Sequence, residues 1–162
     1  MKMTVLYHSK SGNTKQMAET IVEGMLTVEG VEAKCFSIEE VDESWVKESK
    51  CVVLGTPTYM AGVCSAVTTW LQGPCMKYGL VGKIGGAFAT ADYVHGGGDM
   101  AVQTILKNMM VQGMLTYSSG GSCGVPVIHL GPVAISKSLA DYKETFTLYG
   151  QRMATKTTEL FS

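Results

Sequence analysis

The chain has 162 residues, a normal length for one compact domain, and 46% of them are hydrophobic. Charged residues make up 17%, and the formal net charge is −1. This composition excludes a disordered chain, and the weak charge argues against nucleic-acid binding and against electrostatic attachment to a membrane. No stretch has the pattern of a signal peptide or a membrane-spanning helix, so we expect a cytoplasmic protein without membrane insertion.

The hydrophobic pattern of the first half alternates between strands and helices. An apolar run at 3–7 predicts a strand, and a helical period follows from Met17 to Leu26. Residues 31–37 alternate between apolar and polar, which predicts an edge strand with one face exposed to solvent. Residues 51–54 predict a buried strand. A helix is expected over 63–71, because Gly73-Pro74 ends the pattern there.

The second half continues this alternation. Residues 84–90 predict a further strand, and Asp99 is expected to cap a helix that Gly113 stops. Residues 114–117 begin a fifth strand, and an apolar face from Tyr142 to Leu160 predicts a long terminal helix. The chain is therefore predicted to be one α/β domain over residues 1–162, with a five-stranded parallel sheet in a three-layer, doubly wound arrangement. Ligands of such sheets bind at the carboxyl ends of the strands, where the order of strands reverses.

The five cysteines are odd in number and have no Cys-x-x-Cys or zinc-type spacing. We therefore expect reduced thiols and no metal site. Most of the thiols are expected to behave as small buried hydrophobic groups. Cys64 and Cys123 fall in loop-like segments, where one of them can lie near a pocket.

The first segment at a strand end is rich in hydroxyl groups and consists of Ser9, Lys10, Ser11, Gly12, Asn13 and Thr14. Unpaired N–H groups at a helix start, the helix dipole and a glycine that allows close approach all favour a phosphate there. No G-x-G-x-x-G follows the strand and no P-loop is present, so a dinucleotide of Rossmann type is not expected. On composition alone, a Ser/Thr-rich turn that caps the helix is the alternative.

This pattern, [Ser/Thr]-x-[Ser/Thr]-Gly-Asn-Thr between a strand and a helix, resembles the FMN phosphate loop of the flavodoxin superfamily. The similarity extends over nearly the whole chain. It implies a flavodoxin-like fold with strand order 2-1-3-4-5 and FMN, rather than FAD, as the cofactor.

A second segment is similar to the family's second FMN loop and comprises Pro57, Thr58, Tyr59, Met60, Ala61 and Gly62. The resemblance implies that its Pro-Thr-aromatic core lies against the flavin ring and the ribityl chain. Tyr59 offers a π face for stacking on the ring. A turn stiffened by Pro57, with an unrelated tyrosine beside it, is the alternative.

The third segment resembles that of WrbA-type NAD(P)H:quinone oxidoreductases in its His-Gly-Gly-Gly-acid pattern. The resemblance implies flavin contacts from Thr90, Ala91, Asp92, Tyr93, Gly96 and Gly97. It also places His95 at the acceptor pocket as the catalytic candidate, against the alternative of an ordinary surface histidine. This chain has Tyr59 where the WrbA-type loop usually has an arginine, which is a departure at the nicotinamide site.

Residues 118–136 form a long segment without Asp, Glu, Lys or Arg but with several glycines and prolines. Long loops of this kind are usually functional. The segment can cover the flavin edge, complete a hydrophobic acceptor pocket or pack on another subunit, so a homo-oligomer is one of the open alternatives.

The resemblance implies an FMN-dependent oxidoreductase that passes electrons from NAD(P)H, as co-substrate, to a quinone or a similar small-molecule acceptor. The alternative is a flavodoxin-type electron carrier with redox proteins as partners, and a flavin-sensing module is a third class. Carriers of this family are commonly strongly acidic, whereas a net charge of −1 gives little steering. The charge therefore favours the enzyme.

Overall fold

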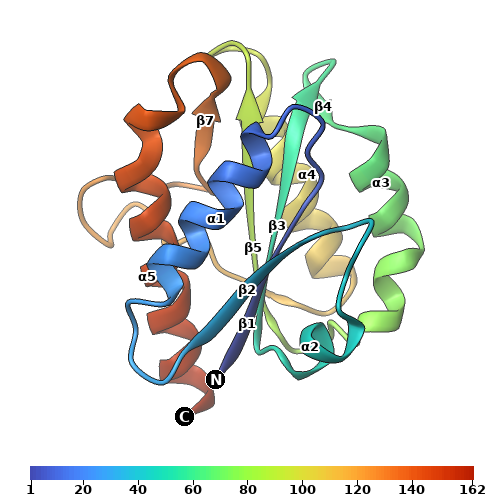
Figure 1. Cartoon of the computed structure of the whole chain (residues 1–162), viewed down its shortest axis with the longest axis vertical. Coiled ribbons are helices and arrows are strands. Elements are labelled where there is room, and N and C mark those ends of the chain that lie inside the picture. Colours follow the sequence, from blue (N-terminus) through green and yellow to red (C-terminus); the bar gives the residue numbers. More distant parts are fainter.

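The computed structural model describes residues 1–162 and shows a central sheet between two layers of helices (Figure 1). The strands are β1 Lys2–Tyr7, β2 Glu32–Ser37, β3 Cys51–Tyr59, β4 Gly62–Val63, β5 Ile84–Ala91, β6 Leu115–Thr116 and β7 Val133–Ile135. The α-helices are α1 Asn13–Met25, α2 Glu43–Glu48, α3 Ser65–Gln72, α4 Gly98–Val111 and α5 Lys143–Phe161. Two 3₁₀ segments, Pro74–Tyr78 and Ser136–Tyr142, complete the regular structure. None of the helices combines the length and the apolar character needed to cross a bilayer.

The sheet has the order β2-β1-β3-β5-β6, with every neighbouring pair on this path parallel. Counted as five positions along the chain, this is the predicted order 2-1-3-4-5, and the predicted α/β class is confirmed. β2 lies at the edge, as its alternating pattern indicated. The short β4 pairs antiparallel with the end of β3, so the chain turns back on itself there.

The fifth position of the sheet is divided between two short strands. β6 pairs with Ile84 and Gly85 at the start of β5, whereas β7 pairs with 89–91 at its end. The expectation of one continuous loop over 118–136 is thus wrong at 133–135, because a three-residue strand is too short to give a readable pattern. Between β6 and β7, the hydroxyl of Tyr149 on α5 accepts a hydrogen bond from the Ala87 N–H at 3.1 Å. A side chain therefore satisfies the sheet where a strand is missing.

Helices α1 and α5 cover one face of the sheet, and α3 and α4 cover the other (Figure 1). The α1/α5 side buries Ile21, Phe146 and Met153 against the sheet. The backbones of these two helices approach closely at Gly24, where a Cβ would lie 1.9 Å from the carbonyl oxygen of Thr147. Glycine is therefore required for this packing.

Helix α2 and strand β3 also differ from the sequence expectation. Helix α2 was not predicted, because six residues are too few to display a helical period. Its N-cap is Asp42, whose side chain accepts from the Trp45 N–H at 3.0 Å. Strand β3 runs to Tyr59 rather than ending at Leu54, because its pairing with β5 continues as far as Pro57 opposite Thr90.

Candidate functional site

Three connections meet at the carboxyl edge of the sheet, which is the upper edge in Figure 1. They follow β1, β3 and β5, and these strands are neighbours in the sheet. The hydroxyls of Thr14 and Thr90 lie 2.9 Å apart, which joins the first connection to the third. A Cβ on Gly97 would lie 2.5 Å from the Cα of Ala61, so the second and third connections are in direct contact. The fold thus brings the three predicted segments together.

The first connection contains several free hydrogen-bond donors at the start of α1. Gly12 has a left-handed conformation with φ 94°, and α1 begins at the next residue. The Ser9 Oγ accepts hydrogen bonds from the N–H groups of Gly12 at 3.1 Å and Lys15 at 3.2 Å. The N–H groups of Ser11, Asn13 and Thr14 have no acceptor within the protein. Free donors at the positive end of a helix fit an anion such as a phosphate.

The polar side chains of this connection differ in exposure. Thr14 is buried and its hydroxyl is bonded to Thr90, whereas Ser11 is exposed and Asn13 is half-buried. Lys10 is exposed and forms no ion pair, and Lys15 lies 3.9 Å from Glu19 on the outer face of α1. Apart from Lys10, the donors of this connection are therefore neutral.

The second connection is a tight turn between β3 and β4. Met60 and Ala61 both have positive φ, 49° and 58°, which is unusual for residues other than glycine. Just before the turn, the Thr58 Oγ1 is buried and has no hydrogen-bond partner. Buried hydroxyls are normally satisfied, so this atom fits a site where a bound group supplies the missing partner.

The third connection bends sharply before α4. The Gly96 N–H donates to the Tyr93 carbonyl at 3.0 Å, and Gly97 takes a left-handed conformation at the N-cap of α4. The prediction that Asp99 is the N-cap is wrong, because the helix already begins at Gly98 and Asp99 lies in its first turn. A carboxylate there interacts favourably with the helix dipole instead.

A cleft of about 330 Å³ lies between the second and third connections. Its lining is Thr58, Tyr59, Met60, Ala61, Ala91, Asp92, Tyr93 and Gly96, and all of these lie in the predicted segments. Tyr59 and Tyr93 supply two aromatic rings to the cleft, and each is about half or more exposed. Such a lining suits a flat ring system. The predicted catalytic residue His95 is exposed and does not line this cleft.

The long segment 117–132 lies elsewhere. It packs along α5, where the Arg152 Nη1 donates to the Ser119 Oγ at 2.9 Å and to the Pro126 carbonyl at 3.1 Å. No residue of the segment lines the cleft between Thr58 and Gly96. The five cysteines are all free thiols, three of them buried, and only Cys123 is exposed.

Comparison with known proteins shows similarity to flavodoxins, in agreement with the predicted resemblance. The family model described as Flavodoxin matches residues 5–112 of the chain. A flavodoxin of Clostridium saccharobutylicum is 38% identical over 161 residues, which cover 99% of this chain and 100% of that protein. An NAD(P)H dehydrogenase (quinone) of Aromatoleum aromaticum is 27% identical over 71% of this chain and 69% of its own length.

Solved structures show the same fold. A flavodoxin from the domain Archaea superposes with a TM-score of 0.80 at 25% identity, over 98% of this chain and 99% of that one. A WrbA-like flavodoxin of Agrobacterium tumefaciens has a TM-score of 0.77 at 24% identity, over 98% of each chain. The match of the family model, the full-length relative and the donor-rich first connection lead to one conclusion. The chain belongs to the flavodoxin family, whose cofactor is FMN.

Proposed function

We propose that this protein is an FMN-dependent electron carrier that exchanges electrons with other redox proteins. The observation that carries the proposal is the 38% identity to a protein named flavodoxin, along the full length of both chains. The relative named as a quinone dehydrogenase is more distant and is matched over a smaller part. This similarity outweighs the net charge of −1, which by itself favoured the enzyme.

The surface around the cleft supports a protein partner. Met60 is fully exposed, Tyr93 and Val94 are 64% and 88% exposed, and Met100 follows on α4. Exposed apolar side chains that gather around a polar site are typical of interaction surfaces. The proposed partner is therefore a redox protein that docks over these four residues, Met60, Tyr93, Val94 and Met100, which we call the docking rim.

Different residues of the site are proposed to contact different parts of FMN. The N–H groups of Ser11, Asn13 and Thr14 are proposed to bind the terminal phosphate, and the Thr58 hydroxyl gains a partner from the bound cofactor. Tyr59 and Tyr93 flank the ring and limit the access of water. When bound, FMN supplies the redox chemistry, while the protein positions it and sets its surroundings.

The decisive experiment is an anaerobic reduction of the FMN-loaded protein. For a carrier, we expect dithionite to reduce the flavin in two resolved one-electron steps, and NADH or NADPH to bleach it only slowly. Rapid, complete bleaching by either nicotinamide, followed by turnover with a quinone, would overturn the proposal.

A matched pair of surface variants tests the docking rim. Val94→Asn changes the rim, whereas Val125→Asn changes an equally exposed valine, at 87%, on the segment beside α5. We expect only Val94→Asn to slow electron transfer to a protein acceptor such as cytochrome c, by about threefold or more. Equal effects of the two variants would show that the rim has no special role.

The second candidate is the NAD(P)H:quinone oxidoreductase, which the pattern at 90–99 and the more distant relative favour. In that case His95 acts at the acceptor step. His95→Ala should then lower the rate of quinone reduction and leave FMN affinity unchanged. Unchanged kinetics with both quinone and nicotinamide would leave His95 as a surface residue.

A further inference from the structure

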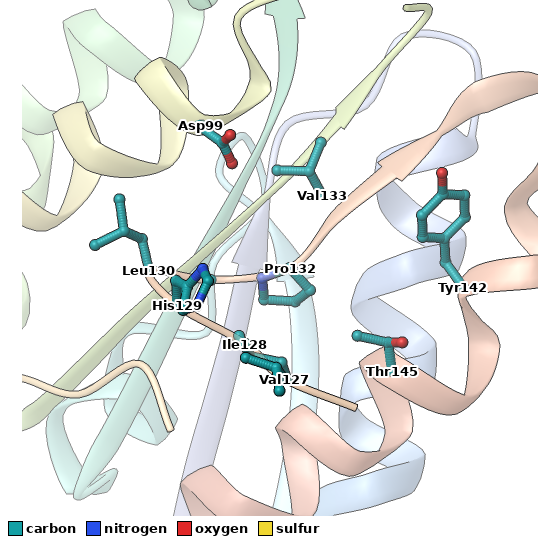
Figure 2. Close-up of a pocket in the computed structure, with 10 residues that line it drawn as sticks. Asp99, Val127, Ile128, His129, Leu130, Pro132, Val133, Tyr142 and Thr145 are labelled. Carbon is teal, nitrogen blue, oxygen red and sulfur yellow. The ribbon is translucent and has the colours of Figure 1, made fainter. Parts of the chain in front are cut away.

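A second cleft lies outside the flavin site, on the flank between α4, α5 and residues 127–133 (Figure 2). Its volume is about 440 Å³, within the range of small-molecule pockets. Figure 2 shows Asp99 on one side, Tyr142 and Thr145 on the other, and the chain from Val127 to Val133 between them. The cleft results from the division of the fifth strand into β6 and β7. Residues 117–132 leave the sheet after β6 and return to it beside the cleft at β7.

The polar groups of this cleft are open to solvent, since Asp99 and His129 are exposed and Tyr142 and Thr145 are half-buried, and they have no partners in the protein. The Asp99 carboxylate, the His129 ring, the Tyr142 hydroxyl and the Thr145 hydroxyl form neither a hydrogen bond nor an ion pair. The four groups come from three separate parts of the chain. Convergent polar groups without internal partners, set among apolar walls, are typical of a binding site for a small molecule.

The residues that line the cleft indicate which class of ligand fits it. Leu130, Pro132 and Val133 provide an apolar surface, and Leu130 is 40% exposed in it. Asp99 is the only acidic residue of the lining, and no lysine or arginine is present. We propose that this cleft binds a small organic cation, with an apolar ring against Leu130 and Val133 and its ammonium or amidinium group at Asp99.

The proposed site is distinct from the flavin cleft but adjoins it. The two clefts share no lining residue. Val133 packs on the first residue of α4, directly after the third connection, since a Cβ on Gly98 would lie 2.5 Å from the Val133 Cγ1. A ligand in the second cleft therefore binds without competing with FMN, although it contacts a residue that packs on the start of α4.

The test uses amide NMR shifts of the FMN-loaded protein with three probes that share one ring: benzylamine, benzyl alcohol and benzoate. We expect benzylamine to shift the amides of Asp99, Leu130 and Thr145 and to bind about fivefold more tightly than benzyl alcohol, with benzoate weakest. The affinity for benzylamine should be the same in the FMN-free and the FMN-loaded protein.

Two variants separate charge from shape. Asp99→Asn should lower the affinity for benzylamine about fivefold and leave that for benzyl alcohol unchanged, whereas Glu29→Gln, on an exposed turn, should change neither. Thr145→Phe fills the cleft and should abolish binding of both probes. Three outcomes would overturn the proposal. The shifts could be centred on Tyr59 and Tyr93, the three probes could bind with the same affinity whatever their charge, or no shifts could occur at about 20 mM probe.

Discussion

Ser9, Ser11 and Thr14 use their hydroxyl groups differently, although they lie in one short loop. Ser9 accepts two backbone N–H groups and so fixes the loop, and Thr14 is bonded to Thr90. Ser11 is exposed and has no partner in the protein. Of the three hydroxyls, that of Ser11 is therefore the one most available to a phosphate.

Ser11→Ala should weaken FMN binding about tenfold, because a hydrogen bond to a charged group contributes about 1.5–3 kcal/mol. Lys10→Ala should cost less, since Lys10 is exposed and an exposed ion pair contributes about 0–1 kcal/mol. Its effect should also fade at high salt. Titration of the apo-protein with FMN at low and high salt gives the comparison. A larger loss from Lys10→Ala that persists at high salt would contradict phosphate binding mainly by neutral donors.

The turn at Met60 and Ala61 is strained by its backbone geometry. Both residues have positive φ, which is typical of the Asn-Gly turn that joins two strands. Met60→Asn combined with Ala61→Gly should stabilise the fold by about 1 kcal/mol. Urea unfolding of the apo-protein measures this, with Ala66→Gly inside α3 as a control that should destabilise. A loss of stability in the turn variant would show that other contacts, and not backbone strain, decide this turn.

At the scale of elements, Tyr149 connects α5 to the divided edge of the sheet. Its hydroxyl is buried and accepts from the Ala87 N–H. Burial raises the pKa of Tyr149 well above its ordinary value of 10.0. A buried phenolate is disfavoured there because it has lost its hydration.

Tyr149→Phe should destabilise the fold by about 1–2 kcal/mol at neutral pH, because the Ala87 N–H loses its acceptor. The pH dependence follows from the raised pKa. Above the ordinary value, the unfolded chain releases this proton while the folded chain keeps it, so wild-type stability falls as pH rises. Between about pH 9.5 and 11, stability of the variant should therefore fall less steeply.

Urea unfolding across this range provides the measurement for Tyr149→Phe. Tyr142→Phe is the matched control, since the Tyr142 hydroxyl has no partner in the protein. Identical pH profiles for wild type and Tyr149→Phe would contradict the role of the buried phenol.

For the whole molecule, the candidate cofactor site joins three connections that lie far apart in the sequence. Thr14 and Thr90 are 76 residues apart and are hydrogen-bonded, and Gly97 packs on Ala61. A ligand that needs all three connections binds the folded chain and not the unfolded one. FMN is therefore expected to stabilise the entire fold by mass action.

FMN at about 100 times its Kd should raise the free energy of unfolding by about 2.7 kcal/mol. At the same FMN concentration, the gain for Ser11→Ala should be about 1.4 kcal/mol smaller, since tenfold in affinity corresponds to that amount. Urea unfolding followed by far-UV circular dichroism, with and without FMN, measures both. An unchanged midpoint in the wild type would mean that FMN does not bind the native state preferentially.

Local patterns in the sequence were sufficient for the donor-rich loop and for most of the elements, but not for α2, β4 and β7. The runs at 3–7 and 84–90 predicted β1 and β5 closely, since a buried parallel strand is continuously apolar. The residues that line the cleft between the second and third connections were all within predicted segments. Strand–loop–helix order places such loops at the carboxyl ends of strands, so chain order alone indicated where the site lies.

Tertiary contacts decided the rest. The N-cap of α4 is Gly97 and not Asp99, because the chain must pack closely on Ala61 before the helix begins. The division of the fifth strand depends on pairing with β5 and on the Tyr149 hydroxyl, neither of which leaves a local pattern. The sequence by itself determined most of the elements and the donor-rich composition of the first loop, because both depend on neighbouring residues. Only the tertiary structure decided which loops touch and which hydroxyls remain free, because those contacts join residues far apart in the chain.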